Sequence, residues 1–118
     1  MENVVERKSF EFAVKIVTVT RKLRASGCEH AMANQLMKSG TSIGANISEA
    51  QQAQSRDDFI AKMSISLKEA NETRYWIRLL KETKTMQAEV ADGLIAQTNE
   101  LISLLSKIIQ SAKAKRGK

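Results

Sequence analysis

Hydrophobic positions recur along this chain with a helical period, and the pattern divides it into four segments. Apolar residues are spaced by three and four, which places them on one face of a helix. The segments cover about residues 4–26, 30–52, 55–82 and 88–112, and short polar stretches separate them. The expected core positions of the first segment are Phe12, Ile16, Val19 and Leu23, widened by Phe10, Val14 and Val17.

The other three segments carry comparable stripes, and the third keeps heptad spacing for three full repeats. The second stripe is Leu36, Gly40, Ile43, Ile47 and Ala50. The third is Phe59, Met63, Ser66, Ala70, Thr73, Ile77 and Leu80. The fourth is Val90, Leu94, Leu101, Leu104 and Ile108, with Ile95, Ile102, Leu105 and Ile109 beside them. These patterns predict four amphipathic helices, each with one buried face.

Few residues in the chain would interrupt such helices, because its 118 residues include five glycines and no proline. Gly27 follows the first segment directly and is suited to end a helix in the left-handed conformation. Ser55, with Asp58 three residues later, is a variant of the capping box. The short connections bring consecutive helices together as antiparallel neighbours. The sequence therefore predicts an all-α protein, an antiparallel up-down-up-down four-helix bundle over residues 1–112, with a basic tail at 113–118.

Composition narrows the classes of protein to which the chain can belong. Lysine and arginine number 19 against 13 acidic residues, a formal net charge of +6 that permits polyanionic partners. The single cysteine, Cys28, excludes an internal disulfide and a zinc site made of cysteines. No apolar run approaches the length of about 18 residues that a membrane span needs. The N-terminal residues 1–8 include charged side chains, and no apolar stretch typical of a signal peptide follows them. We therefore expect a soluble, cytoplasmic protein without a membrane partner.

The motifs that resemble catalytic sites have structural interpretations that fit better. Gly40 and Gly44 lie one turn apart, but a phosphate-binding loop would need a following Gly-Lys-Ser/Thr and a preceding strand. Glu69 and Glu72 are also one turn apart, but a di-iron bundle needs Glu-x-x-His motifs, and His30 is the only histidine. Close helix packing and a structural ion-pair network are the better interpretations. The sequence therefore predicts a protein that is not an enzyme and holds no cofactor or metal.

Two long motifs lie in the second and third segments. Residues 35–50 read QLMKSGTSIGANISEA, and residues 68–80 read KEANETRYWIRLL, with Asp58 and Phe59 between them. Residues 9–13 and the apolar continuation after them begin the first segment. Together these stretches resemble the 23S rRNA-intervening-sequence proteins, also called the four-helix-bundle protein family, over nearly the whole chain.

The resemblance carries expectations about assembly and partners. It implies a small bundle, often assembled as a ring of five copies, with a basic surface suspected of binding nucleic acid. Some family members are encoded inside ribosomal RNA genes, and more distant relatives resemble the accessory proteins of diversity-generating reverse transcriptases. No enzymatic activity is established for the family, so the resemblance specifies the fold better than the function.

Two sets of surface residues are the candidate binding sites. The predicted nucleic-acid contacts gather at one bundle end or on the acid-free tail: Arg21, Lys22, Arg24, Lys113, Lys115 and Arg116. The topology brings the first three of these near the cations that end the third segment, Arg78, Lys81 and Lys84. The predicted oligomer interface is the outer apolar face of the third segment: Ile65, Tyr75, Trp76 and Leu79.

These surfaces leave two hypotheses open. In the first, a homo-oligomer, pentameric by the resemblance, binds structured RNA or DNA through the phosphate backbone with little sequence preference. In the second, the chain is a protein-interaction scaffold or accessory subunit whose outer apolar face docks a partner such as a reverse transcriptase. The sequence does not decide between a nucleic-acid partner and a protein partner.

Overall fold

The computed structural model describes residues 3–116, and the side chain of Arg116 lies outside the described set. The chain forms four helices: α1 (Val4–Ala25), α2 (His30–Ala50), α3 (Arg56–Glu82) and α4 (Ala88–Arg116). The described residues contain no strand, so the prediction of an all-α fold is confirmed. The bounds of the first three helices differ from the predicted segments by two residues or fewer.

The fourth helix is longer than the sequence pattern predicts. It continues without a break to Arg116, so the predicted boundary at residue 112 does not coincide with a change in secondary structure. Alanine and lysine favour helix, and cations near a helix C-terminus complement its dipole, which explains the continuation. Of the predicted tail, residues 117–118 lie outside the described residues.

Side chains and left-handed residues define where the helices begin and end. The Asn3 side chain accepts a hydrogen bond from the Glu6 backbone N–H at 3.0 Å, which caps α1. Ser55 Oγ accepts from the Asp58 backbone N–H at the same distance, so the predicted cap of α3 is confirmed. Gly27, with a φ of 89°, follows α1 in the left-handed conformation, as expected.

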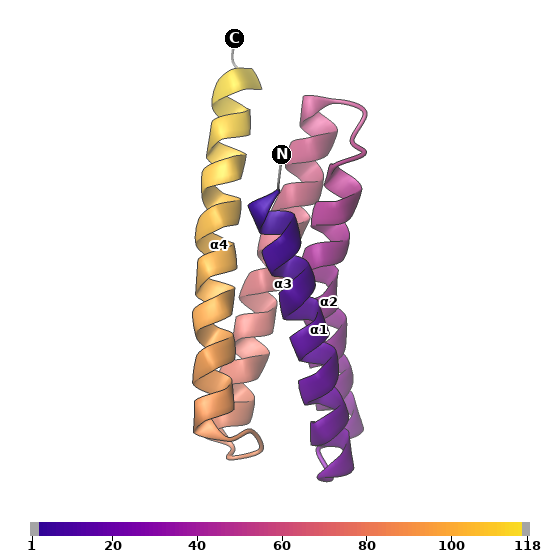
Figure 1. Cartoon of the computed structure of the whole chain (residues 1–118), viewed down its shortest axis with the longest axis vertical. Coiled ribbons are helices and arrows are strands. Elements are labelled where there is room, and N and C mark those ends of the chain that lie inside the picture. Colours follow the sequence, from indigo (N-terminus) through magenta and orange to yellow (C-terminus); the bar gives the residue numbers. More distant parts are fainter. Residues whose placement is uncertain (1–2, 117–118) are drawn as a thin grey trace.

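The helices form an elongated bundle of 52 × 25 × 20 Å, in which each helix returns alongside the one before it (Figure 1). Helix α2 packs against both α1 and α3, and α3 packs against α4. In contrast, α1 and α4 contact each other far less than the other neighbouring pairs do. Within residues 3–116, no helix is long and apolar enough to cross a membrane.

The core lies along the stripes that the periodicity predicts, but the buried face of the helices is narrower than predicted. Phe12, Ile16, Leu36, Ile43 and Leu94 are fully buried. Small hydroxyl residues occupy other core positions, and all are fully buried: Ser9, Thr20, Ser39, Ser66, Thr73 and Thr98. The Ser66 hydroxyl donates to the Ile43 carbonyl of α2 at 2.8 Å, which links two helices inside the core.

Several positions predicted to lie in the core are exposed. Phe10, Val14 and Val90 are exposed, so their assignment to the core was wrong. Helix α1 has one close neighbour instead of two, which limits the width of the face that it can bury. Other predicted core residues are only partly buried: Val17, Val19, Phe59, Leu104 and Ile108.

Close approach of α1 to α2 accounts for the two glycines of the second segment. A Cβ at Gly40 would lie 2.8 Å from Cγ2 of Ile16, and a Cβ at Gly44 would lie 3.2 Å from the Ser9 carbonyl oxygen. Gly40 therefore admits α1 to a distance that a side chain would prevent, and a side chain at Gly44 would lie unusually close to the α1 backbone. This contact supports the packing interpretation of the glycine pair.

Candidate nucleic-acid interface

The last turns of α1 carry three of the six predicted nucleic-acid contacts. Arg21, Lys22 and Arg24 are all exposed, and Lys22 and Arg24 have different neighbours. The Arg24 guanidinium donates to Oδ1 of Asn34 on α2 at 2.6 Å. Within residues 3–116, no carboxylate lies within ion-pair distance of Arg21 or Lys22. Two of the three cations are therefore available for an anion from outside the chain.

Lys22 lies on a groove between α1 and the connection from α3 to α4. The groove has a volume of about 400 Å³. Its lining combines apolar and polar residues: Val19, Lys22, Leu23, Ser26, Thr85, Met86, Gln87 and Val90. It opens where α1 and α4 diverge toward the end of the bundle that carries these connections (Figure 1).

The cations that end α3 lie at the same end of the molecule. Arg78 and Lys84 are exposed, and the Lys81 ammonium donates to Oδ1 of Asp92 at 2.7 Å. Lys22 lines the same groove as Thr85, the residue that follows Lys84 in the chain. Arg24, in contrast, turns toward α2. Exposed acids are also present here: Glu29, Glu82 and Glu89. This end therefore has mixed charge, and of its unpaired cations Lys22 lines the groove.

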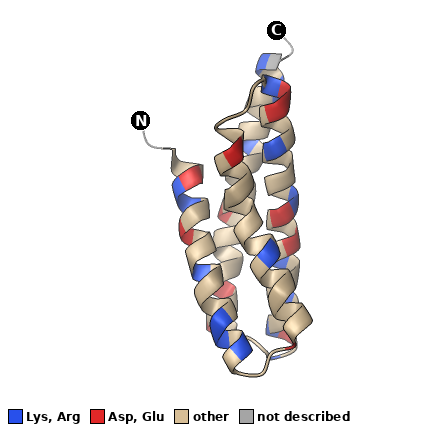
Figure 2. Cartoon of the chain, turned by 90° about the vertical axis from the view of Figure 1, so that its right-hand side faces the viewer, with Lys and Arg blue, Asp and Glu red and all other residues tan. Residues whose placement is uncertain are grey.

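The predicted contacts on α4 lie at the opposite end of the bundle. Lys113 and Lys115 are exposed on the last turns of α4, and the side chain of Arg116 lies outside the described residues. Lys115 shares a groove of about 430 Å³ with Lys107 and Arg56 beside Phe59. Figure 2 shows basic residues toward both ends of the molecule, with acids interspersed. The predicted contacts thus form two separate clusters, not one.

The sequence analysis did not identify Lys15, a basic residue on the same face of α1 as Lys22. Lys8, Lys15 and Lys22 follow one another at seven-residue intervals, which places them on one face of α1. That face looks toward α4, because the Lys8 ammonium donates to Oε2 of Glu100 at 2.9 Å. Lys15 is exposed, and no acid among the described residues pairs with it. The heptad spacing of the three lysines was the signal that could have identified it.

Burial shifts the pKa of two titratable groups away from the basic clusters. Burial and the Glu29 carboxylate raise the pKa of the Cys28 thiol, which keeps it protonated near neutral pH. Burial, with Glu72 nearby, also raises the pKa of Glu69. Within the described part of the chain, no three His, Cys, Asp or Glu side chains are grouped to hold a metal ion.

The predicted oligomer surface on α3 is partly exposed. Ile65 is 48% exposed and Tyr75 is 56% exposed. Trp76 is half-buried against the core and contacts Tyr75 edge to face, with 5.1 Å between the ring centroids. Leu79 is also half-buried. The exposed apolar part of this surface is therefore smaller than the sequence suggested.

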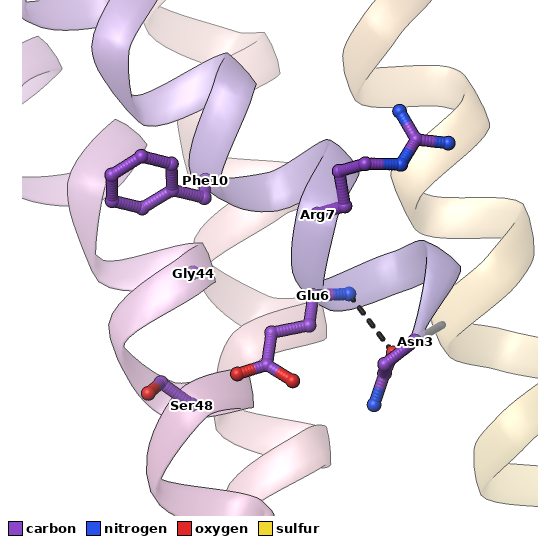
Figure 3. Close-up of a pocket in the computed structure, with 6 residues that line it drawn as sticks. All are labelled: Asn3, Glu6, Arg7, Phe10, Gly44 and Ser48. Atoms are coloured by element: carbon purple, nitrogen blue, oxygen red, sulfur yellow. Dashed lines mark hydrogen bonds between the residues drawn. The ribbon is translucent and has the colours of Figure 1, made fainter. Parts of the chain in front are cut away.

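A second exposed apolar surface lies on α1. Phe10 is 69% exposed and Val14, one turn later, is 53% exposed. Phe10 extends over Gly44 at the rim of a shallow groove of about 360 Å³, whose far end is lined by Glu6 and Ser48 (Figure 3). The sequence analysis missed this surface because it assigned Phe10 and Val14 to the core.

The fold and its surfaces define a small helical-bundle protein with scattered basic clusters. Residues 1–107 match the family described as 23S rRNA-intervening sequence protein, and the chain belongs to that family. A solved structure from Bacteroides thetaiotaomicron, described as a protein of unknown function from the S23 ribosomal protein family, is 50% identical. The match has a TM-score of 0.87 and covers 89% of this chain and 97% of that one. No curated protein matches the chain.

Proposed function

We propose that this chain is a non-enzymatic, basic scaffold that binds structured RNA or DNA through the phosphate backbone. The observation that carries the proposal is the set of exposed cations without acidic partners, on α1, at the α3–α4 connection and at the end of α4. Family membership supports it, because the family's name connects its members with ribosomal RNA. The proposed setting is the cytoplasm, where such nucleic acids are found.

Self-assembly would increase the positive charge that attracts nucleic acid. We propose an antiparallel up-down-up-down bundle that forms a homo-oligomeric ring, with five copies as the number that the family resemblance gives. Each protomer contributes a net charge of +6, so a ring presents a strong positive field to phosphate groups. Binding would release counterions and would therefore weaken steeply as salt concentration rises.

Fluorescence anisotropy tests the proposal with three labelled probes: an RNA hairpin, a DNA duplex and a single strand. We expect binding to the structured probes, with an affinity that falls log-linearly with salt and differs little between sequences. Alanine substitution of Arg21 and Lys22 should weaken binding to all sequences alike. The absence of binding to every probe at low salt would overturn the proposal.

A second candidate function rests on the exposed Phe10 and Val14. An apolar surface on a small protein is suited to docking another protein, and here the partner would be a nucleic-acid enzyme such as a reverse transcriptase. Salt dependence separates the two functions, because an apolar interface does not weaken steeply with salt. A partner captured at high salt by the wild type and by Tyr75→Glu, and lost in Phe10→Glu, would favour this second function.

A further inference from the structure

The inference concerns the residue that follows α3, which adopts an unusual backbone conformation. Lys84 has a φ of 60°, and it is the only non-glycine residue within residues 3–116 with a positive φ. Its conformation lets the backbone N–H groups of Thr85 and Met86 both donate to the Leu80 carbonyl, at 2.9 and 3.0 Å. The left-handed conformation brings Cβ into steric conflict with the backbone, so this position favours glycine.

Helix α1 ends at the same end of the bundle in a comparable way, with glycine. Gly27 has a φ of 89°, and the following Cys28 backbone N–H donates to the Leu23 carbonyl at 3.0 Å. Of two helix ends with the same requirement, one therefore has the residue that the backbone favours and the other has lysine. Local backbone geometry therefore does not account for the lysine at position 84.

Packing and pairing inside the chain do not supply that reason. Lys84 is exposed, and no hydrogen bond or ion pair of its side chain occurs among residues 3–116. The neighbouring Lys81, in contrast, is bonded to Asp92. Residues held in unfavourable backbone conformations concentrate at functional sites. The Lys84 ammonium is therefore free to contact a partner from outside the chain.

The groove lined by Thr85, the residue after Lys84, suggests what that partner is. Thr85, the next residue, lines the groove, and Lys22 lines it from α1 on the other side. Lys15 lies two turns along α1 from Lys22, on the same face. Lys22 thus lines a groove that also includes Leu23 and Met86, and Lys84 directly precedes the groove residue Thr85. Cations placed in this way suit the phosphates of a nucleic-acid backbone.

We propose that Lys84 and Lys22 bind phosphates on the two sides of this groove, and that a nucleic-acid strand lies between them. This inference rests on the proposed nucleic-acid function and deepens it, because it selects one of the two basic clusters as the primary contact. It assigns to Lys84 a role in binding that costs the fold stability. The α4 cluster, with Lys113 and Lys115, then contributes only long-range attraction.

The test is Lys84→Gly, measured both for stability and for binding. Glycine removes the steric conflict, so we expect the melting temperature to rise by about 3–5 °C. It also removes a phosphate contact, so affinity for an RNA hairpin at low salt should fall about 3- to 10-fold and the salt slope should decrease by about one. Lys22→Ala should reproduce the loss of affinity, whereas Lys84→Arg should retain both the affinity and the lower stability.

Matched controls separate this effect from a general loss of charge. Lys68→Ala removes one exposed cation from α3, on the side of the helix away from the core, and should change affinity less than 2-fold. Lys113→Ala with Lys115→Ala should likewise weaken binding less than Lys84→Gly alone. Greater dependence on the α4 pair, or an unchanged melting temperature in Lys84→Gly, would overturn the inference.

The outcomes also distinguish this inference from the function on which it rests. If the wild type binds the hairpin and Lys84→Gly binds equally well, the groove assignment is wrong and the nucleic-acid function stands. If the wild type binds no probe, the proposed function itself fails. A poly-glutamate probe that competes as well as RNA, and depends equally on Lys84, would indicate an acidic protein segment as the occupant and would overturn the proposal.

Discussion

At the scale of single residues, two helical glycines in this chain have opposite structural roles. Gly40 is buried against Ile16, and its missing side chain lets α1 and α2 approach each other. Gly93 lies within α4, is exposed, and has no atom within 4 Å of the place where a Cβ would be. The first glycine is required by packing, and the second only weakens its helix.

The alanine variants of these glycines should therefore change stability in opposite directions. Gly93→Ala should stabilise the protein by about 0.5–1 kcal/mol, because it improves helix propensity without a clash. Gly40→Ala gains the same propensity but forces Ile16 to move, and overpacking of this kind costs about 1–3 kcal/mol, so we expect a net loss. Urea unfolding of both variants measures the difference. Equal stabilisation by both would contradict the close approach of α1 and α2.

A second residue-scale prediction concerns the pH dependence of stability through Glu69. Burial and Glu72 raise the pKa of its carboxyl in the folded state, so the ionised form destabilises the fold. Glu69→Gln should stabilise the protein at neutral pH by a few tenths of a kcal/mol (about 0.3), since the site is partly exposed and screened. Below the ordinary pKa of glutamate both side chains are neutral, so the advantage should disappear there.

Urea midpoints measured for both chains at about pH 3.5 and about pH 7 provide the test of this pH dependence. The advantage of Glu69→Gln should appear as pH rises through the raised pKa of Glu69. An equal advantage at both pH values would show that the carboxylate charge is not the cause. Lys68→Ala is the matched control, because Lys68 lowers the pKa of Glu69 and its removal should increase the advantage of glutamine.

At the scale of helices, the sequence was sufficient to predict where the elements lie. Spacings of three and four reflect the helix period itself, and the cap at Ser55 is a local hydrogen bond that the neighbouring residues determine. Both signals depend only on residues close in the chain. The first three helices therefore begin and end near the predicted positions.

The width of each buried face was not predictable in the same way, because it depends on how many neighbours a helix has. Phe10 and Val14 follow the apolar spacing of α1, but α1 packs closely only against α2 and leaves them exposed. The candidate site shows the same limit. Arg24 and Lys22 were predicted together from a run of cations, but the rotation of α1 directs one toward α2 and the other toward the groove.

The cap of α3 gives a prediction at this scale. Ser55→Ala removes the side-chain acceptor for the Asp58 backbone N–H and should destabilise the protein by about 1 kcal/mol. Ser64→Ala makes the same chemical change at an exposed position inside α3 and should be neutral or slightly stabilising. Thermal unfolding of the two variants compares them directly. Similar destabilisation by both would argue against the cap.

At the scale of the whole molecule, two exposed apolar surfaces lie on helices that do not contact each other. Phe10 and Val14 form one on α1, and Ile65 and Tyr75 form the other on α3. A closed ring needs two different surfaces on each copy, which meet head to tail, whereas a two-fold dimer needs only one self-complementary surface. In the proposed ring, the surface on α1 of one copy would meet the surface on α3 of the next.

This arrangement predicts that the wild type is an oligomer and that each of the two surfaces is necessary for its assembly. Phe10→Glu and Tyr75→Glu should each yield the 13.1 kDa monomer. Each variant places an unpaired charge in the contact between copies, the first on its α1 side and the second on its α3 side. An equimolar mixture of the two variants should form a heterodimer, because each retains the surface that the other lacks. Light scattering after size-exclusion chromatography measures all three samples. A monomeric wild type would contradict the assembly, and a variant that remains oligomeric would exclude its surface from the interface.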